Sequence, residues 1–122
     1  MVYLKSYKEL IVWKKSIELV KEIYILTSKF PKEELYGLTM QMRRCTVSIP
    51  SNIAEGYGRK SRKEYRQFLS ISYGSALELE TQLIISRALN FLKVSGFEKS
   101  DNLLQEVLKM LNSMTTKLRL SA

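Results

Sequence analysis

The chain has 122 residues, which gives room for one domain spanning residues 1–122. With 45% hydrophobic and 26% charged residues, it has the composition of a folded globular protein, which excludes an intrinsically disordered chain. The 20 Lys and Arg residues against 12 Asp and Glu give a formal net charge of +8, which favours polyanionic partners such as nucleic acid. The alternative is that this charge only keeps the protein in solution.

Residues Met1-Val2-Tyr3-Leu4-Lys5 lead directly into helical patterning, without the features of a secretory signal peptide. No apolar run approaches the ~20 residues that are needed to cross a bilayer. The single cysteine, Cys45, excludes an intramolecular disulfide. We therefore expect a cytoplasmic protein that does not enter a membrane.

Two helices are predicted in the first half of the chain, at residues 7–29 and 34–56. Ser6 and Glu9 have the spacing of a capping box before the first helix, and the residue before Pro31 ends it. Apolar residues at helical spacing then predict the core. The stripe of the first helix contains Leu10, Trp13, Ile17, Val20 and Tyr24, and that of the second contains Leu38, Met42, Cys45, Ile49 and Ile53.

Two further helices are predicted at residues 62–93 and 98–118. Ser61 and Glu64 form a second capping box, and Gly96 separates the two helices. Short loops place consecutive helices side by side, so the expected fold class is all-α, an antiparallel up-down-up-down four-helix bundle. The apolar surface of the last two helices is wider than one bundle seam requires, which predicts a homo-oligomer.

The side-chain inventory argues against an enzyme. Without histidine, the chain lacks the commonest general base and the commonest zinc ligand, and one cysteine cannot make a structural zinc site. Cys45 lies on the predicted core stripe, where a buried thiol is structural. The segment from Gly56 to Ser61 has glycines and a lysine but not the spacing of a phosphate-binding loop. We expect no catalytic residue, no metal and no cofactor.

The densest charge lies between Arg59 and Arg66, where five cations surround one carboxylate. Arg62 and Lys63 fall in the first turn of the third helix, where the helix dipole disfavours each cation by ~0.3–1 kcal/mol. Local stability therefore does not explain them, whereas phosphate binding does. The alternative is a solvated turn. The predicted nucleic-acid-binding residues are Arg59, Lys60, Arg62, Lys63 and Arg66, with Tyr57 and Tyr65 to stack on bases and Arg43 as an auxiliary cation.

A polar stripe lies beside the core stripe of the second helix. If the second and third helices form a hairpin that turns near residue 59, Arg44 faces Ser75 and Gln41 faces Glu78. We expect Gln41 or Arg44 to pair with Glu78, since buried polar groups need partners, and Arg43 to face solvent. We interpret the stripe as a structural layer that sets the helix register, composed of Gln41, Arg44, Asn52, Glu78 and Gln82.

Several segments match a known family in order. They include Val12-Trp13-Lys14, Tyr36-Gly37-Leu38, Val47-Ser48-Ile49-Pro50-Ser51-Asn52-Ile53-Ala54-Glu55-Gly56-Tyr57-Gly58-Arg59 and Glu78-Leu79-Glu80-Thr81-Gln82-Leu83. With these segments the chain resembles bacterial four helix bundle proteins whose founding members are encoded within intervening sequences of 23S ribosomal RNA genes. Two residues depart from the family pattern: Cys45 replaces the usual alanine, and Tyr73 replaces a common basic residue.

The resemblance implies a four-helix fold, a ring-shaped homopentamer and a link to ribosomal RNA or mobile genetic elements. A similar protein is the accessory subunit of reverse transcriptases in diversity-generating retroelements. Together with the charge, this predicts a non-enzymatic, basic, oligomeric bundle that binds RNA or DNA mainly through phosphates. The alternative is a protein-interaction scaffold that docks a partner such as a reverse transcriptase.

Overall fold

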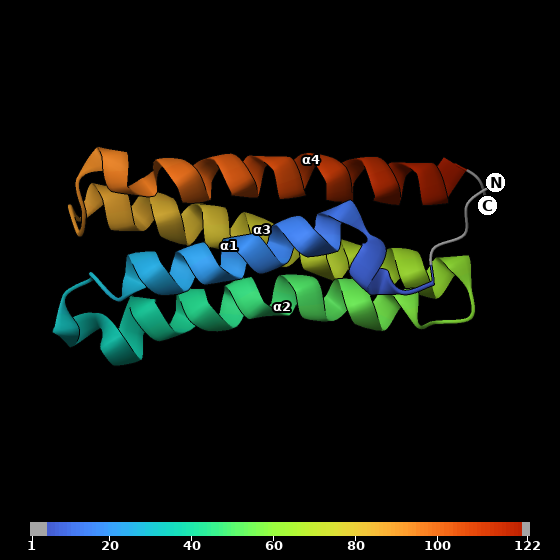
Figure 1. The fold of residues 1–122 in the computed structure, drawn as a ribbon, viewed down its shortest axis with the longest axis horizontal. Helices are drawn as coiled ribbons and strands as arrows, with labels where there is room; N and C mark the ends of the chain where they lie inside the picture. The colour runs from blue at the N-terminus through green and yellow to red at the C-terminus, as the bar shows by residue number, and fades with distance from the viewer. Residues whose placement is uncertain (1–4, 121–122) are drawn as a thin grey trace.

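Four long antiparallel helices form the fold in a computed structural model that describes residues 5–120. The segment Met1–Leu4, which entered the signal-peptide argument, lies outside the described residues. The helices are α1 (Ile11–Thr27), α2 (Met40–Tyr57), α3 (Arg62–Ala88) and α4 (Glu98–Leu120). Each packs against its two neighbours, α1 with α2 and α4, and α3 with α2 and α4, so the predicted four-helix bundle is confirmed (Figure 1).

Short helical turns precede three of the four helices. They are the 3-10 turn η1 (Tyr7–Glu9), the 3-10 turn η2 (Lys32–Glu34), the π turn η3 (Leu35–Thr39) and the 3-10 turn η4 (Val94–Phe97). As Figure 1 shows, the α2–α3 loop lies at the same end of the bundle as the start of α1 and the end of α4. No helix within residues 5–120 is both long enough and apolar enough to cross a bilayer.

The first helix starts later than the sequence predicts. The Ser6 hydroxyl accepts a hydrogen bond from the Lys8 backbone N–H at 3.1 Å, and the Glu9 carboxylate accepts one from the Lys5 backbone N–H at 3.1 Å. These contacts cap η1 rather than α1, because the extended backbone of Leu10 separates the two. The predicted range 7–29 is therefore corrected to a short turn followed by α1.

The third helix ends five residues before the predicted position. Asn90 adopts a left-handed conformation with φ of 58°, the Asn90 N–H donates to the Arg87 carbonyl, and the Phe91 N–H donates to the Ser86 carbonyl. This is a Schellman ending, in which a left-handed residue satisfies the last carbonyls of a helix. At the other end of α3, the Ser61 hydroxyl accepts from the Glu64 N–H at 3.1 Å, so the predicted cap at Ser61 is confirmed.

The core confirms the predicted stripe on α2 and corrects the one on α1. Met42, Cys45, Ile49 and Ile53 are all buried, with Leu38 half-buried beside them. On α1 the buried face is rotated from the predicted one, so that Tyr24 is exposed and Leu10, Trp13, Ile17 and Val20 are half-buried. The buried apolar residues of α1 are Val12, Leu19, Ile23 and Leu26.

Helices α2 and α3 approach closely just before the loop that joins them. A Cβ placed on Gly56 would lie 2.6 Å from the Phe68 Cβ and 3.3 Å from the Tyr65 carbonyl oxygen. Only a glycine allows this approach, since carbon atoms in contact lie ~3.5–4.0 Å apart. The approach lies immediately before the cationic α2–α3 loop.

Candidate nucleic-acid interface

One end of the bundle carries most of the net charge. It combines the start of α1, the α2–α3 loop with the first turns of α3, and the last turn of α4 (Figure 1). We call this surface the basic end. Its cations are Lys5, Lys8, Arg59, Lys60, Arg62, Lys63, Arg66, Lys117 and Arg119, and its carboxylates are Glu9, Glu55 and Glu64. Nine cations against three carboxylates leave +6 of the chain's +8 at this end.

The opposite end is nearly balanced. The end of α1, the α3–α4 connection and the turns that flank them bring together cations and carboxylates in similar numbers. They are Lys29, Lys32, Arg87, Lys93 and Lys99 with Glu33, Glu34, Glu98 and Asp101. Arg87 also pairs with Asp101 at 2.7 Å, so part of this charge is neutralised locally. The protein is therefore polarised along its long axis.

Arg59 is held in place by two contacts. Its Nη2 lies 3.0 Å from Glu55 Oε1 on the last turn of α2, and its guanidinium carbon lies 4.6 Å from the centre of the Phe68 ring on α3. The guanidinium therefore links the two helices across the loop and is partly neutralised. Its contribution to the field of the basic end is smaller than the sequence alone suggests.

Lys60, Lys63 and Arg66 are the least engaged cations of the loop region. None of their side chains makes an ion pair or a hydrogen bond with another described residue. Lys60 and Lys63 are exposed, and Arg66 is half-buried between α3 and α4. Arg62, Lys63, Arg66 and Leu118 line a hollow of ≈160 Å³ between these helices. The structure thus brings Arg62, Lys63 and Arg66 together, as the sequence predicts.

The two tyrosines of the predicted site pack against each other. The rings of Tyr57 and Tyr65 meet edge to face, with 6.1 Å between their centres and 89° between their planes. Burial, and secondly the proximity of Tyr57, raises the pKa of Tyr65, whose ring also packs against the core. Tyr65 therefore supports the α2–α3 junction, and base stacking stays a prediction for the half-buried Tyr57.

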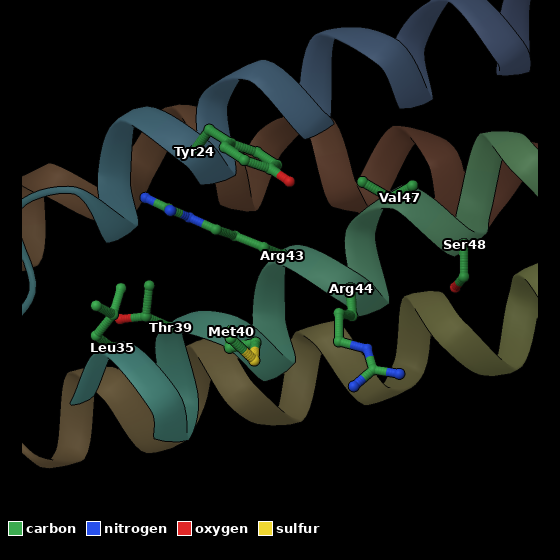
Figure 2. A pocket seen from close by; sticks show the side chains of 8 residues that line it. All are labelled: Tyr24, Leu35, Thr39, Met40, Arg43, Arg44, Val47 and Ser48. Carbon is green, nitrogen blue, oxygen red and sulfur yellow. The ribbon is translucent and has the colours of Figure 1, made fainter.

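Arg43 does not belong to the basic end and does not point into solvent. Its Nε donates to the Thr27 hydroxyl at 3.0 Å, and its guanidinium carbon lies 4.7 Å from the centre of the Tyr24 ring. Figure 2 shows Arg43 reaching from α2 toward α1, beside an apolar hollow of ≈550 Å³. Arg59 follows Arg43 by 16 positions and lies just beyond the end of α2, which at 1.5 Å per residue places the two ~24 Å apart along the helix direction. The predicted auxiliary cation is a structural link between α1 and α2.

The predicted polar layer is present only in part. The alignment of α2 with α3 differs from the predicted one by about one helical turn. Ser75 faces Ser48 rather than Arg44, with 2.7 Å between the two hydroxyl oxygens. Gln41, Arg44 and Glu78 are exposed and line an open hollow of ≈320 Å³ together with Cys45 and Ser48. No ion pair or hydrogen bond joins Glu78 to Arg44 or to Gln41. The expected buried pairing with Glu78 is therefore wrong.

Other members of this layer make local contacts. The Asn52 amide donates to the Ser48 carbonyl of its own helix at 2.8 Å, and Gln82 is buried with its Oε1 unpaired. The Cys45 thiol lies 3.0 Å from the Ser75 carbonyl oxygen and 3.4 Å from Glu78 Oε2. Burial, and then the Glu78 carboxylate, raises the pKa of Cys45 to about 12. The thiol is protonated at neutral pH and is a poor nucleophile.

The fourth helix contributes residues that the sequence reasoning missed. A groove of ≈740 Å³ lies between α3 and α4, next to the basic end, and combines polar side chains from both helices. The signal in the sequence that could have indicated it is the basic pair Lys117 and Arg119 at the end of the last predicted helix, 98–118. The groove is lined by Arg66, Gln67, Ser70, Ile71, Asn112, Thr115, Thr116 and Arg119.

The described residues offer no metal centre. Nowhere between residues 5 and 120 do three or more His, Cys, Asp or Glu side chains come together in a way that could hold a metal ion. The features that remain are a basic end, a polar groove and apolar surfaces on a helical bundle. These features define a class of small, cationic helical-bundle proteins.

Within that class, the chain belongs to the family of 23S rRNA-intervening sequence proteins, which matches residues 8–113. This confirms the family that the sequence resembles. The chain is also similar to a crystal structure from Bacteroides thetaiotaomicron, described as a protein with unknown function from the S23 ribosomal protein family. The TM-score is 0.80 at 25% identity, and the match covers 86% of this chain and 98% of the other. No curated protein matches the chain.

Proposed function

We propose that the protein is a non-enzymatic nucleic-acid-binding bundle of the bacterial cytoplasm, which holds RNA or DNA at its basic end mainly through phosphates. The observation that carries this proposal is the polarisation of charge, with a net +6 at one end and near balance at the other. A solubilising charge has no reason to gather at one end, whereas a phosphate-binding surface does. The family's link to 23S ribosomal RNA genes points in the same direction.

Phosphate contacts position a nucleic acid without reading its sequence. The basic end presents lysines and arginines on the α2–α3 loop and on helix termini. We therefore expect tight but sequence-tolerant binding, with Lys60, Lys63 and Arg66 as the main contributors because no ion pair with another described residue neutralises them.

The test compares two variants that lose equal charge at opposite ends. Lys60→Gln/Lys63→Gln alters the basic end, and Lys29→Gln/Lys32→Gln removes the same charge from the balanced end, where both lysines are exposed. Affinity for a fluorescent structured RNA is measured by anisotropy. The proposal predicts a marked loss for the first variant and little change for the second. Equal losses in both variants would show that binding responds only to net charge.

We also propose that the chain assembles into a homo-oligomer, for which the family resemblance implies a pentamer. The support is the set of large apolar side chains that are exposed on α1, η3, α2 and α3, since exposed apolar surface marks a site of association. Sedimentation at micromolar concentration tests the proposal, and a single monomeric species would contradict it. The exposed apolar side chains outside the α3–α4 groove include Ile11, Tyr24, Ile25, Leu35, Tyr36, Met40, Val47, Leu77, Ile84, Ile85 and Leu89.

The same surface favours a second candidate function, that of a scaffold or accessory subunit that docks a protein partner such as a reverse transcriptase. The apolar hollow of ≈550 Å³ in Figure 2, lined by Tyr24, Leu35, Met40 and Val47 among others, is a surface on which an apolar side chain of a partner could dock. Direct phosphate binding has a steep salt dependence and docking through apolar surface does not, so the two functions are separable by experiment.

A further inference from the structure

The groove between α3 and α4 differs from the rest of the basic end in its chemistry. Besides two arginines, its lining carries two side-chain amides and three hydroxyls, and it includes no Asp or Glu. Arg66 lies in both this groove and the smaller hollow beside Arg62 and Lys63, so the two surfaces are continuous. A ligand held by the loop cations therefore has a direct path into the groove.

Most polar side chains of the groove make no hydrogen bond within residues 5–120. The side chains of Gln67, Ser70, Asn112 and Thr116 make no hydrogen bond with another described residue. The Thr115 hydroxyl is the exception, since it donates to the Leu111 carbonyl at 3.0 Å. Amides and hydroxyls both donate and accept hydrogen bonds. The groove thus offers free groups of both kinds between two guanidinium groups.

We propose that this groove binds the ribose–phosphate backbone of RNA, with Arg66 and Arg119 on phosphates and the amides of Gln67 and Asn112 on the ribose 2′-hydroxyl. This inference rests on the proposed function and deepens it by naming RNA as the preferred nucleic acid. The 2′-hydroxyl is both a donor and an acceptor, and it is the group by which a protein distinguishes RNA from DNA at a given site.

The dimensions and the apolar part of the groove fit this ligand. Asn112 and Arg119 are two helical turns apart on one face of α4, which is ~10 Å along the axis and comparable with a short segment of nucleic-acid backbone. Ile71 lines the groove and is 52% exposed, so it offers an apolar surface to a sugar or a base. A binding surface for phosphates alone would not need uncharged amides between its arginines.

The test uses three fluorescent single strands of one sequence: RNA, DNA and RNA carrying 2′-O-methyl groups. The groove variant is Gln67→Ala/Asn112→Ala. Its matched control is Gln41→Ala/Asn102→Ala, which removes one Gln and one Asn from exposed helical positions outside the groove. Circular dichroism melting verifies that both variants fold. Anisotropy titrations then give the affinity of each protein for each strand.

We expect the wild type to bind RNA more tightly than DNA or 2′-O-methyl RNA. The groove variant should lose roughly three- to tenfold of its RNA affinity, the effect of about one net hydrogen bond, and almost none of its DNA affinity. The control should match the wild type. Equal affinity of the wild type for the three strands, or equal losses for RNA and DNA in the groove variant, would overturn the inference and leave salt-sensitive phosphate binding intact. Absence of binding to every strand would overturn the proposed function itself.

Discussion

The contact between α2 and α3 at Gly56 gives a prediction whose size follows from the geometry. In Gly56→Ala the new methyl group would lie 2.6 Å from the Phe68 Cβ, about 1 Å inside a normal carbon contact. The Phe68 Cβ is attached directly to the α3 backbone and cannot rotate away, so the helices must separate. Overpacking of this kind destabilises by ~1–3 kcal/mol.

Two opposing effects set the net value. Alanine is favoured over glycine by ~1 kcal/mol in a helix interior, and the clash at Gly56 is at the upper end of the overpacking range because the neighbour is rigid. We therefore expect Gly56→Ala to lower the free energy of unfolding by ~2 kcal/mol. Gly74→Ala is the matched control, because a Cβ on Gly74 meets no atom within 4 Å. It should raise that free energy by ~0.5–1 kcal/mol.

Urea unfolding followed by circular dichroism measures the stability of both variants. The urea concentration at the midpoint should shift, while the dependence of the unfolding free energy on urea concentration stays unchanged. In thermal unfolding, the Tm of Gly56→Ala should be about 8 °C lower than that of the wild type. If Gly56→Ala were as stable as Gly74→Ala, the close approach of α2 and α3 would be wrong. The position of Arg59 over Phe68, which depends on that approach, would then be wrong as well.

Three further predictions concern contacts that the sequence did not reveal. Arg43→Met removes the hydrogen bond to Thr27 and the contact with the Tyr24 ring. It should lower the free energy of unfolding by ~1–2 kcal/mol, measured with urea. Its loss of RNA affinity should be smaller than that of Lys63→Gln. Asn90→Gly should leave stability almost unchanged, whereas Asn90→Ala should cost about 1 kcal/mol in the same assay, because φ of 58° suits glycine and opposes alanine. The pKa of Cys45 is about 12 in the folded protein, against 9.0 for an exposed thiol. As the pH rises above about 9, the thiol therefore loses its proton in the unfolded state but keeps it in the folded state. The free energy of unfolding should fall over this range. A Cys45→Ala variant, compared by unfolding at pH 7 and pH 10, should lose less stability over this interval than the wild type.

The sequence predicted the fold class well, because each helix carries its own apolar pattern. The stripe on α2 is correct since Met42, Cys45, Ile49 and Ile53 are its main apolar residues and lie on one face. The stripe on α1 is correct only in part: Leu10 and Trp13 pack against the core, but the fully buried face is that of Leu19 and Ile23. The helix is apolar on two faces, and periodicity alone does not say which of them meets the core. The choice is made by packing against α2 and α4.

The remaining errors come from geometry that spacing does not encode. The α2–α3 register, in which Ser75 lies opposite Ser48, is set by the packing of the two helices, and a residue count across the loop does not predict it. Arg43 was assigned to solvent because its partners, Thr27 and Tyr24, lie on another helix. The cluster at Arg59–Arg66 was found because it is local in sequence. The α3–α4 groove was missed because Arg66 and Arg119 are far apart along the chain.

The salt dependence of RNA affinity tests the central claim most directly. Each phosphate contact on a single strand contributes ~0.7 to the slope of log affinity against log salt concentration. We predict a steep slope for the wild type and a slope shallower by ~1.4 for Lys60→Gln/Lys63→Gln, since two contacts are removed. A slope near zero, or one that this variant leaves unchanged, would contradict phosphate binding at the basic end.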